Sequence, residues 1–250
     1  MPEWLHTLIA TLITAALLFV AYHLVFKDAL FRFAEEEATS GEPSALYGYS
    51  VFGIDISRYQ GDIDWKELKE KNPDSTPIHF VYMKASEGKE MKDPYFDKNW
   101  KEAKEAGFIR GAYHYFTTGS GGAEQAAQFI RNVTLEKGDL PPMVDVEEVP
   151  TDKEAFNREL KHFILALETR YGVKPIIYAS PDFRKNYLDD SIYESYPTWV
   201  AHYHVEKPDI GYWDIWQFTD EGELPGIGHR VDLNIFNGGV QELKKMTLKK

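Results

Sequence analysis

LPPMVDVE, residues 140–147, is an apolar run that ends in two carboxylates one residue apart. A short apolar run of this kind is typical of a buried strand. Because alternate residues of a strand point to the same side, Asp145 and Glu147 are predicted to share the inner face, while Val144 and Val146 pack on the outer one. The two acids would then lie about 6 to 7 Å apart along the backbone.

Two neighbouring carboxylic acids can divide the work of acid catalysis. Burial and mutual repulsion move their pKa values apart, so one acid keeps a proton near neutral pH while the other stays ionised. Cleavage of a glycosidic bond requires this combination. Taken alone, Asp145 and Glu147 are better explained as surface acids at a strand end, so the functional interpretation depends on the rest of the chain.

Short apolar runs alternate with helical patterns along most of the sequence. The eight predicted strands are 51–56, 78–85, 109–116, 142–146, 175–179, 198–201, 213–218 and 230–234. Alternation of this kind implies parallel strands joined by right-handed crossovers, and eight of them indicate an α/β protein with a closed barrel of the TIM type. The connections after the fifth, sixth and seventh strands are too short for full helices, so the last part of the barrel is predicted to be poor in helix.

Four acids fall at the strand ends where a barrel of this type carries its chemistry. Asp55 closes the first strand, Asp145 and Glu147 close the fourth, and Asp232 lies in the eighth, which neighbours the first once the sheet closes. Asp55 or Asp232 alone is explained equally well by a structural role, such as capping a helix. Four convergent carboxylates are costly to bury without a function, so the set favours a catalytic site.

Composition excludes several other classes of function. The formal net charge of −12 would repel phosphate backbones, so nucleic acid is not an expected partner. The absence of cysteine excludes disulfides, thiolate metal sites and cysteine nucleophiles. His202 and His204 alternate on one possible strand end, but no third ligand has suitable spacing, so no metal is expected.

The N-terminal segment is predicted to be a membrane anchor. Residues 5–26 contain no Asp, Glu, Lys or Arg, and a helix of this length spans about 33 Å, enough to cross a bilayer. A cleaved signal peptide is the competing interpretation, but the segment lacks a basic region before it. We therefore predict a single-pass transmembrane helix in residues 1–26, a juxtamembrane spacer in 27–50 and a barrel domain in 51–246.

Motifs spread over residues 52–239 closely resemble the family 25 glycoside hydrolases, which are lysozymes of the N-acetylmuramidase type. The matching stretches include GIDIS (53–57), FVYMKASEG (80–88), GAYHYF (111–116), MVDVE (143–147), WVAHY (199–203), WQFT (216–219) and VDLN (231–234). Their order and spacing make a chance match implausible.

This resemblance carries expectations about fold, activity and residues. It implies a (β/α)5(β)3 barrel and hydrolysis of the β-1,4 bond between N-acetylmuramic acid and N-acetylglucosamine in peptidoglycan, with no metal or cofactor. Glu147 matches the general acid, and Asp145 matches the carboxylate that assists the acetamido group of the substrate or stabilises positive charge. Asp55 and Asp232 match flanking acids. The spacing of Asp145 and Glu147 does not fix the stereochemical course, although analogy favours substrate-assisted retention.

Several further residues are predicted to bind the sugar. These substrate-binding candidates are Tyr113, Tyr178, Trp199, Tyr203 and Gln217. Each aromatic ring taken singly is better explained by core packing, whereas Gln217 is suited equally to a sugar hydroxyl or to the barrel backbone.

The predicted partners are peptidoglycan strands and, through residues 5–26, a membrane. Because this substrate lies outside the cytoplasmic membrane, the barrel is placed on the extracytoplasmic side, with a role in wall remodelling or turnover. The alternative is a catalytically silent, membrane-anchored module for glycan binding or scaffolding. Loss of Glu147 or Asp145 would be the simplest sign of a silent module, and both are present.

Overall fold

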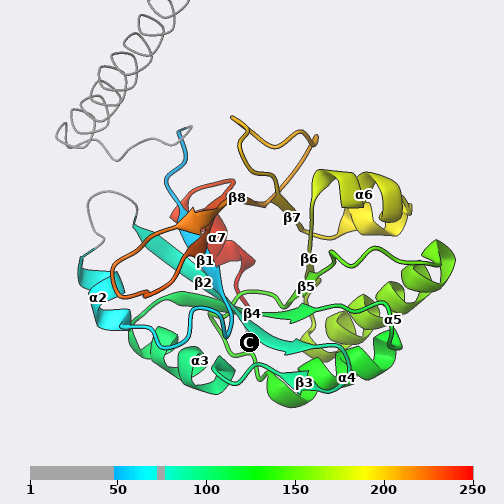
Figure 1. Ribbon diagram of the computed structural model, residues 1–250, viewed down its shortest axis with the longest axis horizontal. Helices are drawn as coiled ribbons and strands as arrows, with labels where there is room; N and C mark the ends of the chain where they lie inside the picture. Colours follow the sequence, from blue (N-terminus) through cyan, green and yellow to red (C-terminus); the bar gives the residue numbers. More distant parts are fainter. Residues whose placement is uncertain (1–47, 72–76, 250) are drawn as a thin grey trace, which may run out of the picture. The chain divides into compact units, whose positions relative to one another are not determined.

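The computed structural model describes residues 48–71 and 77–249 (Figure 1). The predicted anchor in residues 1–26 and residues 27–47 of the predicted spacer lie outside the described residues. Within the described ranges, none of the helices has the length and apolar character needed to span a bilayer.

Eight strands form a closed barrel, as predicted. They are β1 (Phe52–Ile56), β2 (Ile78–Glu87), β4 (Ile109–Tyr115), β5 (Met143–Asp145), β6 (Ile176–Ala179), β7 (Thr198–Ala201), β8 (Ile215–Gly222) and β9 (Val231–Phe236). Strand β1 pairs with β2 on one side and with β9 on the other, which closes the ring. A further short strand, β3 (Met91–Lys92), was not predicted and forms a hairpin with the end of β2.

The direction of the last strand differs from the expectation of an all-parallel barrel. Strands β1 to β8 of the ring run parallel to their neighbours, but β9 runs antiparallel to both β8 and β1. The connection between β8 and β9 comprises only residues 223–230, which is shorter than the crossover of about a dozen residues that parallel strands need, so the chain returns in the opposite direction. The connection from β7 to β8 also lacks a helix but is longer, and these two strands are parallel. Consequently, the first residues of β9 lie at the same end of the barrel as the last residues of the other strands.

Helices cover the outside of the first five strands. They are α2 (Trp65–Glu70), α3 (Phe96–Glu105), α4 (Gly122–Asn132), α5 (Lys153–Tyr171) and α6 (Pro181–Tyr187), followed by the 3₁₀ helix η1 (Ser191–Ser195) and by α7 (Val240–Met246) after the last strand. Figure 1 shows α2 to α6 succeeding one another around the strands. No helix follows β7 or β8, which confirms a helix-poor end and five β/α units followed by three strands. The prediction was wrong for the connection after the fifth strand, β6, which carries the short helix α6 and the 3₁₀ helix η1.

Side chains at the helix ends explain where helices begin and stop. Asp64 and Asp152 accept hydrogen bonds from the backbone N–H groups of Glu67 and Ala155, which caps α2 and α5. The predicted stop at Gly172 adopts a left-handed φ of 70°, a conformation that glycine tolerates better than other residues.

The barrel has one core outside the sheet and another inside it. Val144 and Val146 belong to the outer core, between strands and helices, whereas Met143 belongs to the inner core. This confirms the predicted alternation along β5. Inside the barrel, Gly53 makes room for an aromatic ring, because a Cβ atom at this position would lie 2.3 Å from the ring of Phe80. The packed interior leaves the strand ends as the place for chemistry.

Candidate functional site

The four predicted acids come from three strands that end at one mouth of the barrel. Asp55 lies in β1 and Asp145 is the last residue of β5, with Glu147 two residues beyond it. Asp232 lies near the start of the reversed strand β9, directly opposite Asp55. The antiparallel course of β9 therefore brings Asp232 to the mouth of the barrel.

Asp55 is buried and held by two amides. Its Oδ2 atom accepts hydrogen bonds from Gln217 Nε2 at 2.9 Å and from Asn234 Nδ2 at 2.7 Å. Burial raises the pKa of Asp55 to about 6, although these hydrogen bonds and one from Asp232 oppose the rise. Burial, together with repulsion from Asp55, raises the pKa of Asp232 to about 9. Asp232 is therefore the protonated partner near neutral pH and donates to the Asp55 carboxylate.

Asp145 and Glu147 differ in exposure. Asp145 is 8% exposed, and its Oδ1 atom has no hydrogen-bond partner among the described residues. Burial, followed by repulsion from Glu147, raises the pKa of Asp145 well above its ordinary value. Glu147 is exposed at the mouth, beyond the end of β5, and partial desolvation raises its pKa as well. One acid is thus enclosed and the other is open to solvent, yet their charges interact.

A side-chain network connects the mouth with the interior. Tyr178 donates a hydrogen bond of 2.8 Å from its hydroxyl to Gln217 Oε1, and Tyr203 donates to the same oxygen. The Tyr178 hydroxyl is also within hydrogen-bonding reach of Glu147. Trp199 donates from Nε1 to Asn234 Oδ1 at 3.0 Å. Gln217 and Asn234 thus each bond to Asp55 on one side and to these aromatic side chains on the other.

The predicted sugar-binding residues occupy different depths in the barrel. Tyr113 and Tyr178 are buried and line the interior below the acids, and Tyr203 is half-buried. Trp199 is fully buried, with its ring 4.9 Å from that of Tyr82 in an edge-on arrangement. Gln217 is 2% exposed, and its amide bonds to side chains instead of the barrel backbone suggested from sequence. The structure thus brings all five residues around the acids, with Trp199 and Gln217 deepest.

Two residues of the site were not predicted. Asn234 completes the shell of Asp55, and Lys84 of β2 places its ammonium 2.6 Å from Glu87 Oε2 and 4.6 Å from the centre of the Tyr115 ring. The positive charge of Lys84 lowers the pKa values of both Asp145 and Glu147. The sequence could have indicated both residues, because Asn234 and Lys84 are polar side chains at inward positions of buried strands, and such side chains require polar partners.

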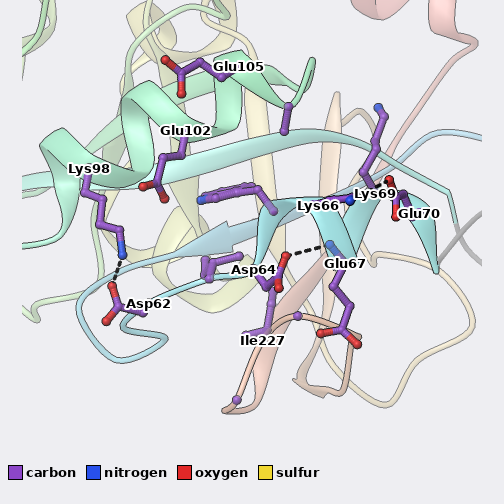
Figure 2. A pocket seen from close by; sticks show the side chains of 15 residues that line it. Asp62, Asp64, Lys66, Glu67, Lys69, Glu70, Lys98, Glu102, Glu105 and Ile227 are labelled. Atoms are coloured by element: carbon purple, nitrogen blue, oxygen red, sulfur yellow. Dashed lines mark hydrogen bonds and ion pairs between the residues drawn. The ribbon is translucent and has the colours of Figure 1, made fainter.

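A separate groove of about 1120 Å³ opens between α2, α3 and the β8–β9 connection, and it contains none of the four acids. Figure 2 shows that much of its charge is satisfied internally, with Lys98 paired to Asp62 and Asp64 bonded to the backbone of Glu67. Across the described residues, no group of three or more His, Asp or Glu side chains is arranged to hold a metal ion. The barrel mouth is therefore the better candidate for catalysis.

Comparison with known proteins identifies relatives of this chain. A profile described as Glycosyl hydrolases family 25 matches residues 54–227. The chain is 38% identical over 199 residues to the uncharacterized protein YegX of Escherichia coli K12, covering 78% of this chain and 73% of that one. It is 31% identical over 210 residues to lysozyme M1 of Streptomyces globisporus, covering 77% and 70% of the two chains.

Solved structures show the same fold. A family 25 glycosyl hydrolase from Bacillus anthracis superposes with a TM-score of 0.73 at 38% identity, covering 80% of this chain and 94% of that chain. A bacterial lysozyme from Streptomyces coelicolor superposes with a TM-score of 0.72 at 29% identity, covering 80% and 98%.

Proposed function

Because the chain belongs to glycosyl hydrolases family 25 and is thus a glycoside hydrolase of the lysozyme type, we propose that it cleaves the β-1,4 bond between N-acetylmuramic acid and N-acetylglucosamine in peptidoglycan. One observation carries this proposal most directly. Asp145 and Glu147 interact electrostatically at the barrel mouth, and the pKa values of both are raised. Such a pair retains a proton in the pH range in which ordinary carboxylic acids have lost theirs.

Glu147 is the proposed general acid. Departure of the sugar as an alkoxide requires a proton at the glycosidic oxygen, and the donor must reach that oxygen. Glu147 is the more exposed member of the pair, so it is better placed than Asp145 to meet a bound glycan. Tyr178, within hydrogen-bonding reach of its carboxyl group, would hold it in position.

Asp145 is the proposed electrostatic partner, in the state of the coupled pair in which the proton lies on Glu147 and Asp145 is ionised, although burial raises the pKa of Asp145 as well. An oxocarbenium-like transition state gains from a nearby negative charge, and an acetamido group attacking its own sugar needs an acceptor for its N–H. The Asp145 Oδ1 atom, which has no partner among the described residues, supplies such an acceptor. We propose substrate-assisted retention on this basis and by analogy with the family. Asp55 and Asp232 would polarise the floor of the site.

Digestion of purified peptidoglycan tests the proposal. The wild-type full chain should release fragments whose new reducing ends are muramic acid, as identified by mass analysis after reduction. The Glu147→Gln variant keeps the shape of the side chain but cannot donate an acidic proton, so its rate should fall by about 10²–10⁴-fold. New reducing ends of glucosamine would mean that the enzyme cleaves a different bond from the one proposed. Equal rates for wild type and Glu147→Gln would mean that Glu147 is not the general acid.

We further propose that residues 5–26 anchor the enzyme in a membrane with the barrel on the extracytoplasmic side. A tether would confine hydrolysis to nearby glycan, which fits remodelling or turnover of the cell's own wall. Cell fractionation with an antibody against the barrel tests this, with the full-length chain expected in the membrane fraction. A shortened chain free in the culture medium would instead indicate a cleaved signal peptide.

A further inference from the structure

The loop that follows β1 presents two large side chains to solvent. Tyr59 is 69% exposed, and the exposed Arg58 lies beside it, with the guanidinium carbon 5.2 Å from the centre of the tyrosine ring. Among the described residues, no carboxylate forms an ion pair with Arg58, and its only side-chain hydrogen bond is a 3.4 Å contact to the Tyr59 hydroxyl. Among the described residues, an apolar ring and a cation without a carboxylate ion-pair partner therefore stand side by side, although the charges of Glu87 and Asp93 also act on Arg58.

The backbone beneath these side chains is fixed. Arg58 N donates to Asp93 Oδ2 at 2.8 Å, and Tyr59 N donates to Ser57 Oγ at 3.3 Å. Gln60 closes the turn, because its Oε1 accepts from Ser57 N at 2.9 Å and its Nε2 donates to Arg230 O at 2.8 Å. A loop held on both sides presents Arg58 and Tyr59 without the ordering cost that a mobile loop would incur on binding.

The same loop lies at the catalytic mouth. It begins immediately after β1, the strand that carries Asp55. Tyr59 also feels the charges of Lys84 and Glu87, and Lys84 in turn acts on Asp145 and Glu147. Arg58 and Tyr59 therefore flank the acids and do not line the outer groove, which is lined by Asp62, Ile63 and Asp64 later in the same loop.

The substrate proposed above offers groups that match both side chains. Sugar rings present apolar C–H faces that pack on aromatic rings, and muramic acid carries either a lactyl carboxylate or, when amidated, a peptide with its own carboxylates. We propose that Tyr59 and Arg58 form an outer saccharide subsite, in which the Tyr59 ring stacks on a sugar and the Arg58 guanidinium binds a carboxylate borne by that sugar's substituent. This inference rests on the proposed function and assigns residues that the four-acid site does not include.

Steady-state kinetics on soluble glycan strands tests the subsite. A contact made equally in the ground and transition states changes KM and leaves kcat unaltered. In the full chain, Tyr59→Ala should raise KM about five- to tenfold, with kcat within about twofold of wild type. Tyr59→Phe keeps the ring and should stay within about twofold of wild type. Tyr212→Ala is the matched control, because Tyr212 is 67% exposed but bonds Asp214, whose carboxylate accepts from the first residue of β7 at the opposite end of the barrel.

Changing the glycan substrate and the salt concentration distinguishes the Tyr59 contact from the Arg58 contact. Arg58→Gln should raise KM about two- to fivefold at low ionic strength, and the difference should fade as salt approaches about 1 M. Strands stripped of peptide present the lactyl carboxylate, whereas intact strands present peptide carboxylates, so the strand type on which Arg58 matters identifies the carboxylate. An unmodified N-acetylglucosamine oligomer, used as a competitive ligand, should lose affinity with Tyr59→Ala but not with Arg58→Gln.

The outcomes distinguish this inference from the proposed function. If wild type cleaves the strands while Tyr59→Ala keeps the wild-type KM, or if Tyr212→Ala raises KM equally, the subsite is wrong and the hydrolase assignment stands. The proposed contact between Arg58 and a carboxylate is wrong if Arg58→Gln still raises KM at high salt. It is also wrong if this variant weakens binding of the neutral oligomer equally. If wild type itself produces no new reducing ends, it is the proposed function that fails.

Discussion

Asp55 and Asp232 are directly opposite each other on the antiparallel strands β1 and β9, so two carboxyl groups face one another at the barrel mouth. Directly opposed residues of such strands have Cβ atoms about 4.5–5.5 Å apart, close enough for strong repulsion if both are ionised. The pair therefore retains a proton on Asp232 near neutral pH, because the pKa values are raised to about 6 for Asp55 and about 9 for Asp232. The site thereby gains a polarised carboxylate at some expense of stability.

Asp232→Asn should stabilise the fold above about pH 6. A carboxyl group whose pKa is raised on folding binds more protons in the native state than in the unfolded state, so stability falls as pH rises towards the folded pKa. For Asp232 this loss extends to about pH 9. Asparagine carries no charge and can still donate to Asp55, so the variant should gain about 1–3 kcal/mol at pH 7.

Thermal melting of wild type and Asp232→Asn between pH 5 and about pH 9 measures this difference. The gap between the two melting temperatures should widen with increasing pH. The same substitution at Asp220, an acid whose charge also reaches Asp232, provides a matched control with a smaller effect. A constant gap across the range would show that Asp232 does not titrate differently in the folded and unfolded chains.

Gln217→Met should cost more stability than Tyr203→Phe, although Tyr203 donates to Gln217. Methionine removes a donor to Asp55 and leaves the hydroxyls of Tyr178 and Tyr203 without their common acceptor. Loss of buried partners of this kind costs about 2–3 kcal/mol, whereas Tyr203→Phe leaves Tyr178 on the same oxygen and should cost about 1 kcal/mol or less. Urea unfolding gives both values, and equal costs would argue against a central role for Gln217.

Much of the barrel could be predicted because burial leaves a direct mark on sequence. Apolar runs located all eight strands, and alternation along β5 correctly separated Met143 from Val144. The direction of β9 could not be predicted in this way, because periodicity reports which face of a strand is buried and not which way the strand runs. The short connection before β9 was the missing clue.

The acids were easier to predict than the residues that hold them. A carboxylate at a strand end is visible in one segment of sequence, whereas the partners of Asp55 come from β8 and β9 and are known only once the barrel closes. Glu147 shows a second limit. Strand alternation was extended to it from Asp145, but β5 ends at Asp145, so Glu147 lies at the open mouth and is more exposed than a strand residue would be.

Gly53→Ala should destabilise the barrel although it adds only one methyl group. The new Cβ would lie 2.3 Å from carbon atoms of the Phe80 ring, which is itself fully buried and has no space to retreat. Overpacking of this kind costs about 1–3 kcal/mol. Gly119→Ala is the control, because no atom lies within 4 Å of its added Cβ, and it should stay within about 0.5 kcal/mol of wild type. Equal unfolding midpoints in urea for the two variants would contradict the packing argument.

Lys84→Met should move the whole pH profile of kcat/KM to higher pH. The Lys84 charge lowers the pKa values of Asp145 and Glu147, so its removal raises both. If Glu147 acts as the protonated acid, activity persists to higher pH on the alkaline side; if Asp145 acts as an ionised carboxylate, activity also appears at higher pH on the acidic side. Coulomb interaction at the barrel mouth makes a displacement of about one pH unit reasonable.

Lys84→Arg separates charge from packing in this experiment. Arginine keeps the positive charge opposite Glu87 and over the Tyr115 ring, so its profile should stay near that of wild type even if the rate falls. A displacement of only one limb in Lys84→Met would mean that Lys84 acts on only one of the acids. A profile that does not move at all, with a normal melting temperature, would show that neither Asp145 nor Glu147 controls the reaction, because both feel this one cation.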